Sequence, residues 1–144
     1  MADSAGEEQL QVWAVEICAQ ARIREIGGPE DWSRLVSEFP RDVTGSRQYD
    51  WNSWTGEAGP WVLPDWTAVA RDWDGVHLSV AGFLTASVLP MAAGNAATLL
   101  AGWEPDRTLW LNDAFTKVDY VGPWRGTPGS AALPEFVLPW LRQR

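Results

Sequence analysis

The amino-acid sequence predicts an α+β fold: a single domain in which an antiparallel β-meander sheet is packed on one face by short helices. Two observations support this class. Segments with apolar residues three and four positions apart, which is helical spacing, alternate with segments of period two, which is strand spacing. The connections between the expected strands are short, which favours antiparallel pairing because parallel strands need long crossovers. The length of 144 residues suits one domain.

The composition limits the classes of partner. There are 19 acidic and 11 basic side chains, and the net charge is −8. Nucleic acid and membrane are therefore not expected partners, because both attract basic surfaces. Cys18 is the only cysteine, so no internal disulfide can form and a cytoplasmic location is expected. Residues 1–8 are polar and acidic and predict a disordered tail before a domain spanning residues 9–144.

Residues 10–26 fit either a strand or a helix. Apolar side chains alternate along this segment as in a strand. The same residues also give one side of a helix, formed by Leu10, Trp13, Ile17 and Ala21. Because Gln, Glu and Ala favour helices, we expect a helical or mixed segment to about Gln20 and a strand over residues 21–26.

A helix is expected between Pro29 and Pro40. Proline suits the first helical turn, and a second proline ends the element. The apolar stripe of this helix is Trp32, Leu35, Val36 and Phe39. Residues 41–60 then predict a long loop, because they are polar, rich in glycine and aromatic, and long ordered loops are often functional.

Residues 61–112 are expected to form the centre of the domain. Asp65 can cap a short helix whose apolar stripe is Trp66, Val69, Ala70 and Trp73. From Val76 to Val88 the period changes to two, which predicts a strand with an aliphatic core face and a small, polar opposite face. Gly82 interrupts the aliphatic face and marks either a bulge or a close approach by another group.

Two further strands are expected in the meander. Residues 90–95 predict a loop, and residues 96–103 predict a strand. A turn at residues 104–107, where proline presets the backbone, leads to a third strand over residues 108–112.

The stretch after Asn112 is expected to be irregular, because glycines and prolines interrupt residues 122–129. Residues 133–141 are apolar enough to dock as a short helix or strand.

Two segments carry a resemblance to other proteins. The run Arg-Asp-Trp-Asp-Gly-Val-His-Leu-Ser-Val-Ala-Gly within residues 65–85, together with Gly-Trp-Glu-Pro-Asp-Arg within residues 100–111, resembles Trp-rich actinobacterial proteins. The similarity extends back to about Ala21, through Asp31-Trp32, Ser46-Arg47 and Asp50-Trp51. That group has no assigned activity, so the resemblance implies no function.

Residues 74–82 are also similar to the histidine-bearing last block of the SGNH hydrolases. That family needs a Gly-Asp-Ser nucleophile after an early buried strand. The early candidate here, Ala2-Asp3-Ser4, lies in the expected tail with no strand before it, and the histidine block lies in the middle of the chain. The sequence therefore argues against this family.

His77 is the only histidine and the first candidate for chemistry. Asp72 and Asp74 are close in sequence, and a carboxylate can orient an imidazole ring for acid–base catalysis. The alternative is a hydrogen-bonded structural histidine. The spacing matches no zinc or cation motif, so we expect no metal and no cofactor.

The expected loop holds a second group of candidates. A hydroxyl, a guanidinium, a carboxylate and an indole lie within six positions, at Ser46, Arg47, Asp50 and Trp51. Arg47 can clamp an anionic ligand group with two parallel hydrogen bonds. The alternative is an Arg47–Asp50 ion pair that fixes the loop.

Tryptophan is the most distinctive residue type, with 11 positions. Trp32, Trp66 and Trp73 lie on helical stripes and are expected in the core. Others have polar neighbours in expected loops, where aromatic rings line ligand pockets or anchor partners. These are Trp51, Trp54, Trp61 and Trp124. The alternative is that they cap the core of a domain that lacks long elements.

These observations lead us to expect one of two functions. The first is a non-catalytic, aromatic-lined binding module of immunity or regulatory type, which binds a small molecule or a protein partner as a monomer or homodimer. Its expected ligand-binding residues are Ser46, Arg47, Asp50, Trp51, Trp54, Trp61, Ser79, Phe83 and Trp124. The second is a small hydrolase or cyclase in which His77 works with Asp72 or Asp74.

Overall fold

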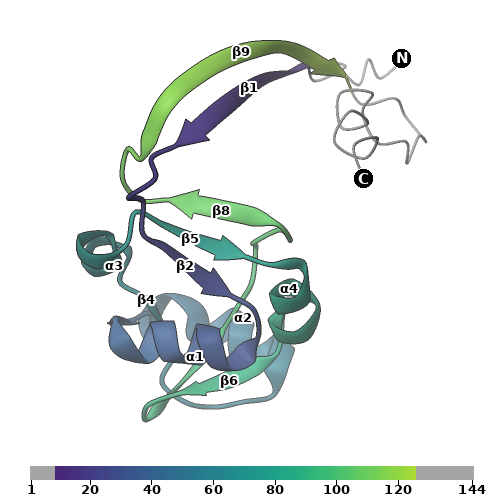
Figure 1. Ribbon diagram of the computed structural model, residues 1–144. Helices are drawn as coiled ribbons and strands as arrows, with labels where there is room; N and C mark the ends of the chain where they lie inside the picture. The colour runs from purple at the N-terminus through teal and green to yellow at the C-terminus, as the bar shows by residue number, and fades with distance from the viewer. Residues whose placement is uncertain (1–8, 126–144) are drawn as a thin grey trace, which may run out of the picture. The chain divides into compact units, whose positions relative to one another are not determined.

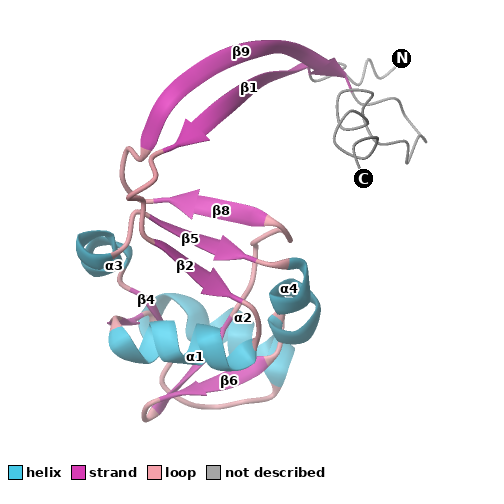
Figure 2. Ribbon diagram, in the orientation of Figure 1, coloured by secondary structure: helices cyan, strands magenta, loops and turns pink. Residues whose placement is uncertain are grey.

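The computed structural model describes residues 9–125 as a mixed α/β chain with four helices and several short sheets (Figures 1 and 2). The elements are β1 Gln9–Ile17, β2 Ile23–Ile26, α1 Pro29–Glu38, β3 Pro40–Asp42, α2 Thr44–Thr55, β4 Val62–Pro64, α3 Trp66–Asp72, β5 Gly75–Leu78, α4 Val80–Ala86, β6 Pro90–Ala93, β7 Ala96–Leu99, β8 Arg107–Trp110 and β9 Phe115–Arg125. Among the described residues, no helix has both the length and the apolar character needed to cross a lipid bilayer.

The described chain divides into two compact units. One unit is residues 17–115, and the described residues of the other are 9–16 and 116–125. The expected tail and the expected element at residues 133–141 lie outside the described residues. A single domain over residues 9–144 stays a prediction.

The central sheet of the larger unit has the strand order β2-β5-β8. β2 pairs in parallel with β5, and β8 pairs antiparallel with β5. This sheet is therefore mixed and differs from the expected meander. The parallel pair is allowed because the chain between β2 and β5 is long and contains three helices, which together form the crossover that parallel strands require.

The expected strand from Val76 to Val88 is correct only to Leu78. The Ser79 side chain accepts a hydrogen bond from the Gly82 N–H at 3.0 Å and so caps α4. Val80 and Leu84 are four residues apart, and residues at this spacing share one face in a helix as well as in a strand. The apolar pattern from Val76 to Val88 was therefore wrongly assigned to a single strand. At Gly82, the expected close approach is confirmed: a Cβ atom there would lie 2.2 Å from the Ile26 carbonyl oxygen.

The main core lies on one face of the central sheet. Its fully buried sheet residues are Ile26, Val76 and Leu78. Helical residues in the same cluster are Trp32, Leu35 and Val36 of α1, Val69 of α3 and Ala86 of α4. The predictions of α1 and α3 are confirmed, and Asp65 caps α3 by accepting hydrogen bonds from the Thr67 and Ala68 N–H groups.

Three tryptophans extend this core. The rings of Trp32, Trp66 and Trp103 lie 6.0–6.4 Å apart, each in contact with the other two. The buried indole N–H of Trp32 donates to the Thr98 hydroxyl at 3.2 Å. Aromatic contacts of this kind add to the stabilisation from burial, and the hydrogen bond satisfies the one polar atom that the Trp32 ring takes into the core.

Residues 41–60 form β3, α2 and the connection to β4, so the expectation of a long loop is wrong. The Asp42 carboxylate accepts a hydrogen bond from the Thr44 N–H at 2.8 Å. The Val43 carbonyl accepts hydrogen bonds from the N–H groups of Ser46 and Arg47, and these bonds form the first turn of the helix. Only Trp51 of α2 is buried, so the helix lacks the apolar stripe by which helices are recognised in a sequence.

The β6–β7 hairpin replaces a second expected loop. Residues 90–95 were expected to be irregular, yet Pro90–Ala93 pairs antiparallel with Ala96–Leu99. Gly94, with a φ of +60°, provides the turn. The strand expected over residues 96–103 ends at Leu99, which pairs with Pro90, and Leu100 forms only an isolated bridge to Ser87.

The smaller unit is a two-stranded ribbon of β1 and β9, which run in opposite directions in Figure 1. The expected helical segment to about Gln20 is wrong. The strand alternative is correct as far as Ile17, and residues 18–20 lie in the turn that follows. The expected irregular stretch after Asn112 is wrong over residues 115–125, since β9 continues through Gly122 and Pro123, and its remainder from residue 126 lies outside the described residues. Proline is tolerated at residue 123 because a strand with only one partner has a free edge.

Candidate functional site

The outer face of α2 gathers four of the expected ligand-binding residues. Ser46, Arg47, Asp50 and Trp54 are exposed and lie three or four positions apart in sequence, so they share one side of the helix. Trp54 is 67% exposed. Tyr49 is 87% exposed and, five positions before Trp54, projects about 140° away from it around the helix axis. Together these residues form the α2 surface: Ser46, Arg47, Tyr49, Asp50 and Trp54.

Sequence reasoning missed Tyr49 as a site residue. The signal was present, because Tyr49 is three positions after Ser46 and four before Ser53, which is helical spacing. Because residues 41–60 were expected to form a loop, this helical spacing was not used in the prediction.

The inner face of α2 is held by two buried tryptophans. Trp51 and Trp61 pack edge to face with ring centroids 5.2 Å apart. The Trp61 indole N–H donates to the Asn52 side-chain oxygen at 2.7 Å, which ties the helix to the residue before β4. Trp51 and Trp61 thus belong to the core, as the alternative stated, and not to an open pocket. They fix the position of the α2 surface instead of forming part of it.

The Arg47 guanidinium lies over the Trp51 ring, 5.9 Å from its centroid. Cation–π contact of this type orients the side chain while leaving its charge at the surface. The alternative Arg47–Asp50 ion pair is not among the ion pairs of the described residues. Both side chains are exposed.

His77 lies on the face of the central sheet opposite the main core. Its Nδ1 atom is 2.8 Å from Glu25 Oε2, and its Nε2 atom is 3.3 Å from Asp106 Oδ1. Partial burial alone would lower the pKa of His77, but the hydrogen bonds and negative charges of Glu25 and Asp106 outweigh it and raise that pKa above 6.5. Both ring nitrogens thus lie within hydrogen-bond distance of a carboxylate.

The expected partners of His77 have other positions. Asp74 accepts hydrogen bonds from the Arg22 N–H at 2.8 Å and from the Asn112 side chain at 3.2 Å. The backbone hydrogen bond from Arg22 is the main reason that the pKa of Asp74 is lowered. Asp72 ends α3 and is exposed, and neither aspartate hydrogen-bonds His77 in the described part of the chain. The structure does not assemble the expected trio.

The three remaining candidates lie elsewhere. Ser79 caps α4 and also donates to the Ile26 carbonyl at 3.2 Å. Phe83 is partly buried against the main core. Trp124 belongs to the ribbon unit.

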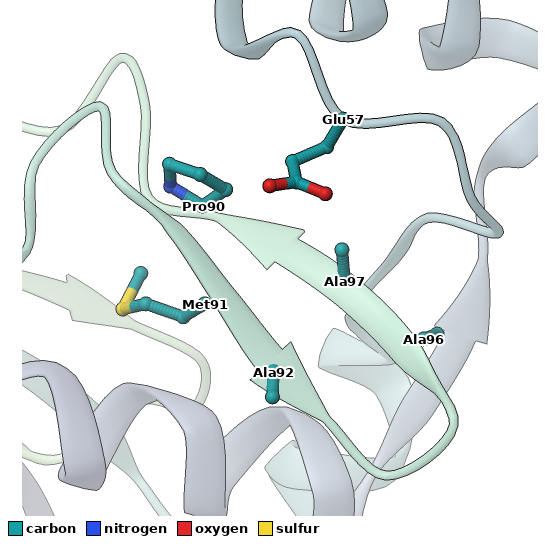
Figure 3. A pocket seen from close by; sticks show the side chains of 6 residues that line it. All are labelled: Glu57, Pro90, Met91, Ala92, Ala96 and Ala97. Atoms are coloured by element: carbon teal, nitrogen blue, oxygen red, sulfur yellow. The ribbon is translucent and has the colours of Figure 1, made fainter.

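Two pockets in the described residues contain none of the expected ligand-binding side chains. One, of about 250 Å³, lies beside the β6–β7 hairpin, where the Glu57 carboxylate extends toward Pro90 and Ala97 (Figure 3). The other, of about 350 Å³, is lined by Ala101, Gly102, Trp103, Arg107, Thr108 and Leu109. Sites for drug-sized ligands are usually about 300–1,000 Å³ and well enclosed, so the first is small for such a ligand and the second is at the lower end.

Over residues 9–125, no group of three or more histidine, cysteine, aspartate or glutamate side chains has an arrangement that would hold a metal ion. Comparison of the chain with protein-family models, curated proteins and solved structures finds no match.

Proposed function

We propose that this protein is a non-catalytic binding module that docks a protein partner on the α2 surface. The observation that carries the proposal is the exposure of Tyr49 and Trp54 on a helix whose other face is anchored by Trp51. Tryptophan, tyrosine and arginine are the residue types most often found at the energetic centre of protein interfaces, and α2 presents all three.

A protein partner is favoured over a small molecule by the form of the surface. The candidate side chains project from the exposed part of a helix, whereas the two pockets described above lie at other elements. Small-molecule sites bury most of the ligand in a concavity, but a protein partner can enclose projecting side chains in its own groove.

The charge indicates the character of the partner. With a net charge of −8, the chain attracts positively charged surfaces and accelerates their association. Arg47 and Asp50 then provide one charge of each sign beside the aromatic rings, which favours one orientation of the partner over others. A small acidic inhibitor or regulator of a basic protein fits this pattern. The proposal places this activity in the cytoplasm, in keeping with the single cysteine.

The enzymatic alternative receives less support. A general base needs an accessible ring nitrogen, and the two nitrogens of His77 each face a carboxylate. We therefore assign the imidazole a structural role between β2, β5 and the turn before β8.

The test compares three baits in the same native lysate: the wild-type chain, a Tyr49→Ala/Trp54→Ala variant and a Leu84→Ala control. Leu84 is 75% exposed on α4, so the control removes a comparable apolar side chain from another surface. Quantitative mass spectrometry should identify a protein that the wild type and the control retain and the α2 variant loses.

The identified protein is then titrated in purified form. Each single substitution, Tyr49→Ala or Trp54→Ala, should weaken binding by more than about 1 kcal/mol, or about fivefold in Kd, if these rings are anchors. Equal retention of every captured protein by wild type and α2 variant would refute the proposal.

A further inference from the structure

The ribbon carries one face without any charged side chain. The contact between the Trp13 and Tyr120 rings, with centroids 4.9 Å apart, shows that these two residues are on the same side of the ribbon. Because side chains alternate along a strand, every second residue shares that side. Over the part of the ribbon from Gln11 to Tyr120, its members are Gln11, Trp13, Val15 and Ile17 from β1 and Thr116, Val118 and Tyr120 from β9. These residues are referred to as the uncharged ribbon face.

The opposite face is different. It carries Glu16, Lys117 and Asp119, and the Lys117 ammonium pairs with the Asp119 carboxylate. Between the ends of the ribbon, charged residues thus occur on one side only, although the chain as a whole is strongly acidic. A face that excludes charge in such a chain is suited to contact with another apolar surface.

The uncharged ribbon face is open in the structure. Its large apolar residues, Trp13, Val15, Ile17, Val118 and Tyr120, are each 42–55% exposed. A two-stranded ribbon with an open apolar face is marginally stable in water, and it gains stability when another layer covers that face.

We propose that a second copy of this chain covers the uncharged ribbon face, so that the protein forms a two-fold symmetric homodimer through β1 and β9. Two identical faces without charge can meet with no like-charge repulsion between them and no charge to desolvate. A contact through the opposite face would instead bring the Glu16 and Asp119 carboxylates of both copies together.

The distribution of residues along the face also fits a two-fold axis. The rings of Trp13 and Tyr120 lie toward one end, and the aliphatic Val15, Ile17 and Val118 lie toward the other. When the two-fold axis crosses the strands, the aromatic end of each copy packs on the aliphatic end of its partner. Bulky rings then meet smaller side chains at both ends of the interface.

The area determines how strong this contact is. With side chains about half exposed, the face offers on the order of 500 Å² per copy. This is below the roughly 800 Å² per partner of standard stable interfaces, so the dimer should dissociate on dilution. The inference does not depend on the proposed function, because it concerns a different element.

The test is sedimentation velocity of the full chain from low micromolar to near-millimolar concentration. The wild type should change from monomer to dimer over this range. Val118→Glu should weaken the dimer at least tenfold in Kd, because two carboxylates would be brought into the interface. The matched control is Val121→Glu on the opposite face of β9. Val118 and Val121 are both 52% exposed, and the control should dimerise as the wild type does.

A charge-exchange experiment separates loss of contact from loss of folding. Val15 lies near the middle of the face, so Val15→Glu and Val15→Lys should each be monomeric alone and should form a dimer when mixed. A wild type that stays monomeric at all concentrations would overturn the proposal, as would unchanged association in Val118→Glu, equal loss in Val121→Glu, or the absence of a mixed dimer.

Discussion

Gly82 lies directly against the main chain of Ile26, where a Cβ atom would be 2.2 Å from the Ile26 carbonyl oxygen. The same oxygen accepts hydrogen bonds from the Ser79 N–H at 3.1 Å and the Ser79 hydroxyl at 3.2 Å. Because these bonds hold the carbonyl in place, the contact between α4 and the end of β2 depends on the absence of a side chain at residue 82.

Gly82→Ala should therefore lower the free energy of unfolding by about 1–3 kcal/mol, as expected when extra atoms are forced into a packed site. Gly45→Ala is the control: no atom lies within 4 Å of a Cβ there, and alanine favours the helix α2. That variant should be neutral or more stable by up to about 1 kcal/mol. Urea denaturation measures both, and equal stabilities would contradict the tight contact.

Trp51 and Trp54 should differ sharply in their contribution to stability. Trp51 is buried against Trp61, so Trp51→Ala should cost about 3–5 kcal/mol. Trp54 projects into solvent, so Trp54→Ala should change the stability by no more than about 0.5 kcal/mol. Thermal unfolding of the two variants provides the comparison. A large loss for Trp54→Ala would show that this residue supports the core and would remove it from the α2 surface.

The His77 cluster should make stability depend on pH near neutrality. Glu25 and Asp106 raise the pKa of His77 in the folded protein above the ordinary value of 6.5. The resulting stabilisation is fully present below pH 6.5 and is lost as the pH rises through the folded-state pKa. Since His77 is the only histidine, NMR can follow its ring protons without ambiguity.

Glu25→Gln should lower the pKa of His77, because the negative charge at Nδ1 is removed while partial burial remains. In this variant the loss of stability between pH 6 and pH 8 should become smaller. A pKa at or below 6.5 in the wild type would contradict the cluster as described.

Asp74 and Asp72 offer a second matched pair. Asp74 accepts hydrogen bonds from Arg22 and Asn112, whereas Asp72 is exposed. Asp74→Ala should lower the urea midpoint, and Asp72→Ala should leave it nearly unchanged. The pKa of Asp74 is lowered in the folded protein, so its contribution is present above pH 3.8 and is lost as the pH falls through the folded-state pKa. The difference between wild type and Asp74→Ala should disappear in acid. A midpoint that Asp74→Ala leaves unchanged at neutral pH would argue against this role.

Elements with a strong local pattern were predictable from the sequence. The helix from Pro29 has a proline at its start and an unbroken apolar stripe, and Asp65 supplies a cap before the stripe of α3. In β5 the alternation correctly separates buried Val76 and Leu78 from the His77 face. In each case the local pattern and the tertiary packing favour the same conformation.

Other elements depend on distant contacts that periodicity does not reveal. The helix α2 is held by the packing of Trp51 on Trp61, ten residues later, and β9 by its pairing with β1 at the other end of the described chain. The carboxylates that engage His77 come from β2 and from the turn before β8. Proximity in sequence therefore indicated Asp72 and Asp74, whereas register within the sheet brings Glu25 beside the ring.

The pairing of β2 with β5 also affects how the chain folds during its synthesis on the ribosome. Glu25 and His77 are register partners 52 residues apart, and β2 has no other sheet neighbour among the described strands. At about 5–20 residues per second, roughly 3–10 s of synthesis separate the two strands. During that interval β2 has no sheet partner, so Ile26, which is fully buried in the folded protein, stays exposed until β5 has been made. Protease digestion of stalled nascent chains should show protection of this region only after β5 has left the exit tunnel.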